Sequence, residues 1–131
     1  MRYRGMKHPI LKIIVAGFWI SFSEFLRNDI LFNSYWVNHF MHLGLTYQRL
    51  PINGLLWAVW SFLFAYVMYR LLLRLCFWEV FGLSWLTAFA MMWIVLFNLQ
   101  VLPLGLLLFA IPLSMIEILV AELIMKKVQN P

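Results

Sequence analysis

The chain has 131 residues, of which 65% are hydrophobic and 11% are charged. A soluble domain is about 45–50% apolar and about 25% charged, and a domain this small buries only part of the apolar surface that it carries. The composition therefore argues against a soluble enzyme, a nucleic-acid-binding module and a disordered chain. We expect residues 1–131 to form one all-α membrane domain whose main partner is the lipid bilayer.

Two apolar segments in the first half of the chain are candidate membrane spans. A helix needs about 20 mostly apolar residues to cross the hydrocarbon of a bilayer. The first span covers about residues 10–28 and carries Lys12 near one end and Glu24 near the other. The second covers about residues 54–75 and has no charge before Arg70. The basic N-terminus is typical of a signal peptide, but no small-residue cleavage motif follows, so we expect the first span to be retained.

The segment between these spans has its own helical pattern. Ser34, Asn38 and His42 recur every four residues within residues 30–43, and mostly aromatic and aliphatic residues fill the positions between them. That spacing places the polar side chains on one face of a helix. We therefore predict a short helix lying in the membrane–water interface, which Gly44 would end.

The second half of the chain is long enough for two spans. Residues 80–116 contain no charged side chain. A single helix of that length would measure about 55 Å, nearly twice the thickness of the hydrocarbon. Polar residues and Pro103 cluster near the middle, which predicts a turn there. The third span is then about residues 80–102 and the fourth about residues 104–125, with Pro112 expected to kink the fourth helix.

The basic residues predict how the four spans are oriented. In a four-span arrangement, eight of the ten Lys and Arg side chains fall on one side of the membrane: Arg2, Arg4, Lys7, Lys12, Arg70, Arg74, Lys126 and Lys127. Because short cytoplasmic segments of membrane proteins carry an excess of basic residues, both termini are predicted to be cytoplasmic. The high pI of about 9.7 is then a topology signal, and we expect no nucleic-acid partner. In a bacterium this would be a multi-pass inner-membrane protein.

Small and polar residues recur at heptad-like spacing along the spans. Such stripes let membrane helices approach closely, so they predict a four-helix transmembrane bundle with the stripes inward. Chance recurrence is the alternative. The stripes are Gly17, Ser21, Glu24 and Asn28; Gly54, Ala58, Ser61 and Ala65; Ala110, Ser114, Glu117 and Ala121; and, more weakly, Ser84, Ala88, Met91, Val95 and Asn98.

Glu117 is the deepest carboxylate in the predicted bundle. A carboxylate in the hydrocarbon is costly, so it marks a candidate functional position. Glu117 could carry a proton or bind a cation. Two structural alternatives are an ion pair with Arg70 and a hydrogen bond to a tyrosine hydroxyl.

A second candidate site lies nearer the other membrane surface. Glu24, Asn28, Asn98 and His39 are predicted to surround a pocket that the helix at residues 30–43 covers. The space for this pocket would come from small residues at the start of the second span.

Several charged residues have structural explanations instead. Arg27 follows Glu24 by three residues and could neutralise it within one helix turn. Glu122 and Lys126 are expected to form an i, i+4 pair near the cytoplasmic end. Counting 1.5 Å per residue along straight helices places Glu24 and Glu117 at depths about 12 Å apart.

The chain lacks the common catalytic and cofactor motifs. It has no nucleophile motif, phosphate loop, dinucleotide fingerprint or HExxH sequence, and Cys76 is its one cysteine. His39 and His42 could share a metal with Glu24 in principle, but histidines in an interfacial helix more often contact headgroups and water. We therefore predict no metal site and no cofactor.

Three functions remain compatible with these observations. The first, which we favour, is membrane-embedded binding or transport of a small or lipophilic ligand, where a transporter this small would need a homodimer. The second is an accessory subunit bound to a partner membrane protein. The third is an intramembrane lipid-modifying enzyme that uses Glu24, Asn98 and His39; catalysis is less favoured than binding.

Overall fold

The computed structural model describes residues 8–47 and 50–127, which contain helices and no strand. Four helical stretches in this part of the chain are long and apolar enough to cross a membrane. They are Pro9–Leu31, Pro51–Leu72, Phe77–Asn98 and Leu104–Lys127. Each overlaps one predicted span, so the prediction of an all-helical chain with four such helices is confirmed.

The first long helix changes its hydrogen-bond pattern near its end. α1 (Pro9–Phe25) begins with a proline, which suits the first helical turn because that turn needs no backbone N–H donor. It continues as a π-helical segment, η1 (Leu26–Leu31), where the Phe32 N–H donates to the Arg27 carbonyl five residues back at 2.8 Å. Helical structure of this first stretch thus extends to Leu31, three residues beyond the predicted end.

α2 (Asn33–His42) is the short helix predicted between the first two spans. It begins three residues later than predicted because η1 occupies the preceding positions. Gly44 adopts a positive φ of 72°, its N–H donates to the Met41 carbonyl at 3.0 Å, and the Leu45 N–H donates to the Phe40 carbonyl at 2.8 Å. This pattern closes a helix with a left-handed glycine, as the sequence predicted.

The second long helix, α3 (Pro51–Leu72), begins three residues before the predicted span. Pro51 fits the first turn, and the Leu50 N–H donates to the Asn53 side chain at 3.0 Å. Both features favour an earlier start than hydropathy alone indicates.

The third long stretch is divided into three parts. α4 (Phe77–Trp85) is followed by the π-helical η2 (Leu86–Ala90) and then by α5 (Met91–Asn98). The Cys76 N–H donates to the Glu79 carboxylate at 3.0 Å at the start of α4, so Glu79 caps this helix.

The turn predicted near Pro103 is present. Gln100 adopts a positive φ of 61°, and a 3-10 turn, η3 (Leu104–Leu106), leads into α6 (Leu107–Lys127). Pro112 lies inside α6.

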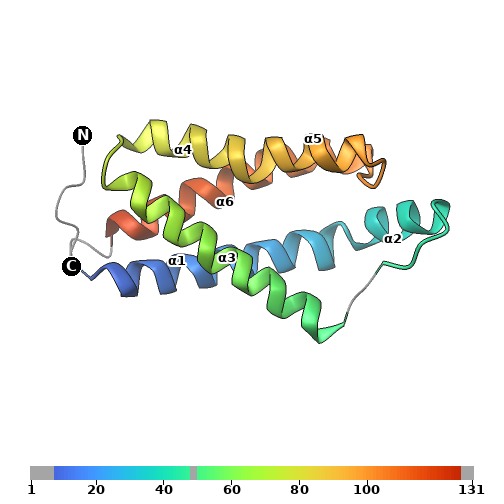
Figure 1. Ribbon diagram of the computed structural model, residues 1–131, viewed down its shortest axis with the longest axis horizontal. Helices are drawn as coiled ribbons and strands as arrows, with labels where there is room; N and C mark the ends of the chain where they lie inside the picture. Colours follow the sequence, from blue (N-terminus) through green and yellow to red (C-terminus); the bar gives the residue numbers. More distant parts are fainter. Residues whose placement is uncertain (1–7, 48–49, 128–131) are drawn as a thin grey trace.

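The long helices run alternately up and down the bundle (Figure 1). α1 packs mainly on α3 and α6, and α4 packs on α6 and α3. We call the end where α1 begins and α6 finishes the closed end. Its core includes side chains from all four long helical stretches that are at most 2% exposed: Ala16, Ile20, Ala65, Met68, Leu72, Val80, Ile118, Ala121 and Met125.

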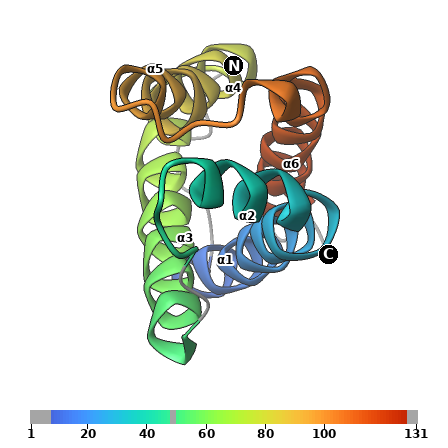
Figure 2. The ribbon, with the colours of Figure 1, turned by 90° about the vertical axis from the view of Figure 1, so that its right-hand side faces the viewer.

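The opposite end, which we call the open end, is packed less closely. α5 makes few contacts with the other long helices, and the first turns of α3 diverge from the bundle. A Cβ added at Gly54 would meet no atom within 4 Å. Viewed along the bundle, α2 lies across this end, between α3, α1, α6 and α5 (Figure 2).

The predicted small-residue stripes face inward to different degrees. All four positions of the α6 stripe are buried, as are Gly17 and Glu24 of the α1 stripe. In α3, Ser61 and Ala65 are buried, whereas Gly54 is exposed at the open end.

The predicted stripe of the third span is wrong beyond Ser84. Met91, Val95 and Asn98 are exposed, and the buried residues after Ser84 are Phe89 and Trp93. The step of five residues from Ser84 to Phe89 matches the i→i+5 hydrogen bonds of a π-helix, which lies at this point. η2 therefore rotates α5 relative to the face that a continuous α-helix would present.

Candidate functional site

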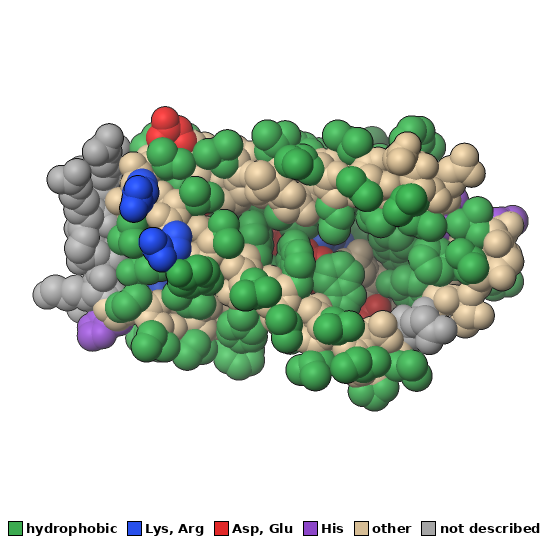
Figure 3. All heavy atoms as spheres, viewed as in Figure 1, with side chains coloured by type: hydrophobic (Ala, Val, Ile, Leu, Met, Phe, Trp, Pro, Cys, Tyr) green, Lys and Arg blue, Asp and Glu red, His purple; other side chains and the backbone are tan. Residues whose placement is uncertain are grey.

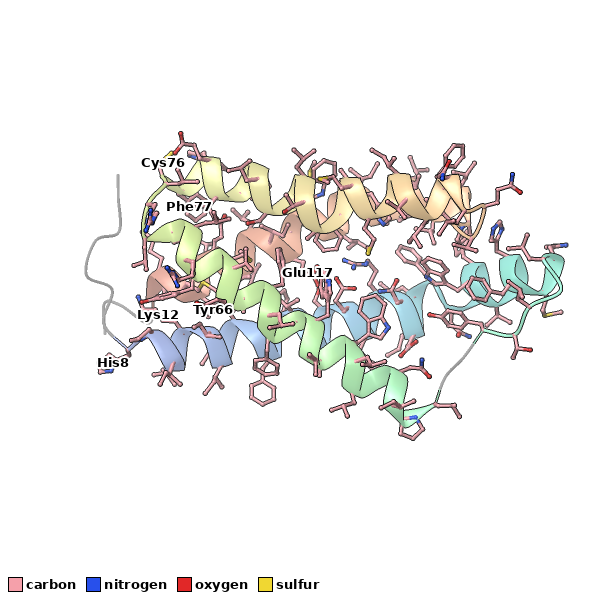
Figure 4. All side chains as sticks on the ribbon, viewed as in Figure 1. His8, Lys12, Tyr66, Cys76, Phe77 and Glu117 are labelled. Carbon is pink, nitrogen blue, oxygen red and sulfur yellow. The ribbon has the colours of Figure 1, made fainter. Side chains whose placement is uncertain are left out.

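Arg27 joins two buried carboxylates from different helices. Its Nη2 lies 2.5 Å from Glu24 Oε1, and its Nη1 lies 3.3 Å from Glu117 Oε2. All three side chains are at most 7% exposed. The ion pair connects η1 and the last turns of α1 to the middle of α6, and Glu117 lies within the bundle between the helices (Figure 4).

The two π-helical segments meet at this arginine. Arg27 lies in η1, and its guanidinium carbon is 5.0 Å from the ring centroid of Phe89, which lies in η2. A guanidinium over an aromatic face is attracted by the negative face of the ring. Since π-helical turns are frequently found at functional sites, their convergence on one buried cation marks this position as a candidate site.

Asn28 extends the ion pairs into a hydrogen-bonded cluster. Its Nδ2 donates to Glu24 Oε2 at 3.0 Å, and its Oδ1 accepts a hydrogen bond from Trp36 Nε1 at 3.2 Å. Trp36 belongs to α2, so the hydrogen bond ties the helix that covers the open end to the buried charges. We call Glu24, Arg27, Asn28 and Glu117 the Arg27 cluster.

The Arg27 cluster contains two carboxyl groups and one guanidinium. Glu24 uses both carboxylate oxygens, toward Arg27 and toward Asn28. Glu117 Oε1 is buried and has no hydrogen-bond partner among the described residues. If both carboxyl groups are ionised, the cluster has one negative charge in excess, which a proton or a bound cation would balance.

A cavity of about 360 Å³ borders the cluster beneath α2, and we call it the roofed cavity. Its wall combines polar cluster residues with five aromatic rings and aliphatic side chains. The lining residues are Glu24, Arg27, Asn28, Trp36, Phe40, Tyr47, Asn53, Trp57, Met92, Trp93, Leu96, Leu106 and Ala110. Acidic and basic side chains are visible at the bottom of a hollow in an otherwise mostly hydrophobic face (Figure 3).

A second cavity of about 350 Å³ lies between α1 and the start of α3, and we call it the lateral cavity. It shares Glu24, Asn28 and Trp57 with the roofed cavity. Its other lining residues are Phe18, Ser21, Phe22, Phe25, Asp29 and Gly54. Glu24 is therefore reached from two sides, and Trp57 lies in the wall common to both cavities.

The predicted pocket of Glu24, Asn28, Asn98 and His39 is only half correct. Glu24 and Asn28 are together, but His39 and Asn98 line another cavity, of about 650 Å³, around the turn before α6. The His39 Nε2 lies 2.8 Å from the Gln100 carbonyl oxygen. η1 delays the start of α2, and His39 consequently lies over the turn after α5 instead of over Glu24.

The structure also contradicts one alternative considered for Glu117, the ion pair with Arg70, and the depth expected for it relative to Glu24. Arg70 does not pair with Glu117: Arg70 is exposed, and its Nη1 donates to the Tyr66 hydroxyl at 2.8 Å one turn away. Nor are Glu24 and Glu117 separated into two levels about 12 Å apart, because both contact the Arg27 guanidinium. Depth counted along straight, parallel helices fails where helices cross and where a long side chain reaches between them.

The predicted pair of Glu122 and Lys126 is not formed. Lys126 is exposed, whereas Glu122 is fully buried and neither of its carboxylate oxygens has a hydrogen-bond partner in the described ranges. Lys12 is also buried at the closed end (Figure 4), and its Nζ has no partner there.

The bridging role of Arg27 and the contributions of Trp36, Trp57 and Phe89 were not predicted from the sequence. One signal was available: an arginine within an apolar span is costly unless it is paired on more than one side. The contacts of Phe89 depend on the π-helical segment η2, and no local sequence motif predicts such a segment.

Residues 8–47 and 50–127 contain no group of three His, Cys, Asp or Glu side chains that could hold a metal ion. No family model, curated protein or solved structure matches the chain.

Proposed function

We propose that the four long helices span a membrane, with the closed end on the cytoplasmic side. Arg70 and Arg74 border the turn between α3 and α4 at the closed end, and Lys126 and Lys127 end α6 there. This distribution supports cytoplasmic termini by the positive-inside rule. α2, with exposed Tyr35 and Met41, would then lie in the opposite interface.

The function that we propose is binding, or carriage across the membrane, of a small amphipathic ligand in the roofed cavity. The observation that carries this proposal is a cavity lined by aromatic and aliphatic side chains next to a buried charge cluster. Ligand sites in proteins are typically apolar cavities of about 300–1,000 Å³ with a few polar groups that orient the ligand. The roofed cavity has this size and composition.

The position of the lateral cavity supports access from the bilayer. It borders the exposed Phe18, Phe22 and Phe25 on the outer face of α1, and it shares Glu24 with the roofed cavity. A lipophilic molecule could therefore approach the cluster between α1 and α3 without passing through water.

The alternative of a lipid-modifying enzyme is less favoured because its three residues are not assembled. Glu24 lies in the Arg27 cluster, whereas His39 and Asn98 line the separate cavity around the Gln100 turn. The accessory-subunit hypothesis would instead require a partner chain held at the membrane-facing surface.

Native mass spectrometry of the protein, extracted gently from its membrane, tests the proposed function. We expect a bound small molecule of constant mass on the wild-type chain. Met92→Trp would fill part of the roofed cavity, whereas Met91→Trp would change the preceding residue of α5, which is exposed. The bound mass should disappear in Met92→Trp and remain in Met91→Trp.

Two results would contradict the proposed function. One is a wild-type chain that carries no small molecule, and the other is equal occupancy of the Met91→Trp and Met92→Trp variants. A co-purifying membrane subunit, with the roofed cavity empty, would favour the accessory role instead. Thermal unfolding of both variants checks that each is folded before the masses are compared.

A further inference from the structure

We propose that the ligand of the roofed cavity is a small organic cation, an ammonium group that carries apolar substituents. This inference rests on the proposed function and adds the chemical class of the ligand. Three features of the described residues carry it: the charge balance of the Arg27 cluster, the engagement of Arg27, and the aromatic lining of the cavity.

The charge balance favours a positive ligand. Glu24 and Glu117 both contact Arg27, so two buried carboxyl groups share one guanidinium. An excess negative charge inside a membrane protein is costly unless a proton or another cation neutralises it. Glu24 lines the roofed cavity, so a cation there would lie beside the cluster.

Arg27 is poorly placed to receive an anion. Its Nη1 and Nη2 each donate to a carboxylate, and its guanidinium stacks on Phe89. These two hydrogen bonds use two of the five guanidinium N–H groups, and the positive charge of Arg27 already faces two carboxyl groups. A phosphate or carboxylate ligand would add a further negative charge beside Glu24 and Glu117, and this like-charge repulsion makes an anionic ligand unfavourable.

The aromatic lining suits a cation with apolar substituents. Five rings border the roofed cavity: Trp36, Phe40, Tyr47, Trp57 and Trp93. The rings of Trp36 and Tyr47 are stacked at 6.0 Å with an angle of 10° between their planes, and Phe40 meets Tyr47 edge-on at 5.2 Å. Aromatic faces attract ammonium groups through the negative charge of the ring face, and clusters of such rings bind quaternary ammonium ligands.

The polar groups and the size of the cavity limit the ligand further. Asn28 and Asn53 contribute side-chain amides to the wall, which can accept hydrogen bonds from an ammonium N–H. A cavity of about 360 Å³ is at the small end of the range for ligand sites. We infer a ligand with one charged nitrogen and one or two rings or short chains.

Three probes of matched shape test the charge of the ligand on the unaltered protein. They are benzyltrimethylammonium, its neutral carbon isostere neopentylbenzene, and the anion benzylphosphonate. Binding to the protein in nanodiscs of zwitterionic lipid is measured by quenching of tryptophan fluorescence. We expect the cation to bind about tenfold more tightly than either other probe.

A pair of variants tests whether the charge of the Arg27 cluster contributes to binding. Glu117→Gln removes one carboxylate of the Arg27 cluster, whereas Glu122→Gln makes the same change five residues along α6, where the carboxylate does not contact Arg27. Affinity for benzyltrimethylammonium should fall about tenfold in Glu117→Gln and stay unchanged in Glu122→Gln. Equal losses in both variants would overturn the inference.

The probe results separate this inference from the proposed function. If neopentylbenzene or benzylphosphonate binds as tightly as the cation, the inference is overturned while a ligand-binding role stands. If the wild-type protein carries no ligand and binds none of the three probes, the proposed function fails and the inference fails with it.

Discussion

At the closed end of the bundle Lys12 and Glu122 are buried without an ion-pair partner in the described ranges, whereas at the open end Glu24, Arg27 and Glu117 form one connected cluster. Burying a charge costs several kcal/mol unless ion pairs and hydrogen bonds compensate it. The chain therefore satisfies its buried charges most completely where the bundle encloses cavities. The paired charges thus belong to the cluster that borders the cavities, and the unpaired ones lie away from them.

The approach of α1 and α3 to each other also differs along the bundle. Near the middle of both helices, a Cβ on Gly17 would lie 2.3 Å from the Phe62 ring, so this glycine is required for the contact. At the open end, a Cβ on Gly54 would meet no atom within 4 Å. Helix contact in one region and separation in the other produce the lateral cavity.

The largest effect is expected from removing the guanidinium group of Arg27. Arg27→Met leaves two buried carboxylates without their common partner, and we expect a loss of roughly 3–5 kcal/mol in the free energy of unfolding. Reversible denaturation in mixed micelles measures it. The triple variant with Glu24→Gln and Glu117→Gln should recover much of the loss, and a single-variant loss below about 1 kcal/mol would show that the pairs contribute little.

Replacing the acids of α6 sharpens the comparison between paired and unpaired charges. Glu117→Met breaks the ion pair to Arg27 and should destabilise the fold by roughly 3 kcal/mol. Glu122→Met removes two unpartnered carboxylate oxygens and should stabilise the fold by about 1 kcal/mol or more. Unfolding curves recorded under identical conditions give the difference, and the same sign for both variants would be inconsistent with the contrast.

Alanine substitutions at Gly17 and Gly54 test whether α1 and α3 are close at one position and separated at the other. Gly17→Ala should cost about 1–3 kcal/mol because the Phe62 ring must move. Gly54→Ala should be neutral or stabilise by about 0.5–1 kcal/mol, because alanine favours helix and the space is empty. Thermal unfolding of the two variants is the measurement, and equal destabilisation would mean that α1 and α3 are also in contact at the open end.

The smallest expected effect concerns the link between α2 and the cluster. Trp36→Phe removes the donor to Asn28 while keeping an aromatic ring, so we expect a loss of about 0.5–1.5 kcal/mol. Amide hydrogen exchange should rise in α2 and in η1. Trp78→Phe, at an exposed position of α4, is the matched control and should leave exchange in α2 unchanged.

The sequence predicts the long helices well because their signals are local. Apolar length identifies the four stretches, and the proline near the middle of the uncharged segment marks the turn at residues 99–103. Gly44 ends α2 as expected because only its positive φ permits that closure. The Glu24–Arg27 pair was also predictable, since three residues separate the two side chains on one helix.

The remaining features depend on contacts between distant segments. A π-helical turn differs from an α-helical turn by one hydrogen-bond position, and its sequence does not distinguish it, so the exposure of Met91 and Asn98 was unforeseen. Arg27 can reach Glu117 only because α1 and α6 pack together. His39 contacts Gln100 only because of how the segments before α2 and after α5 turn.

The π-helical segments also make the orientation of the following helix sensitive to the insertion or deletion of a single residue. Each holds one residue more than the α-helical turn that it replaces, so deletion of one residue within 86–90 would restore a regular α-helix. The following segment would then turn by about 100° about its axis, and Trp93 would leave the cavity wall. In these two places an insertion or deletion changes which side chains face the interior, with little change in the span of the helix.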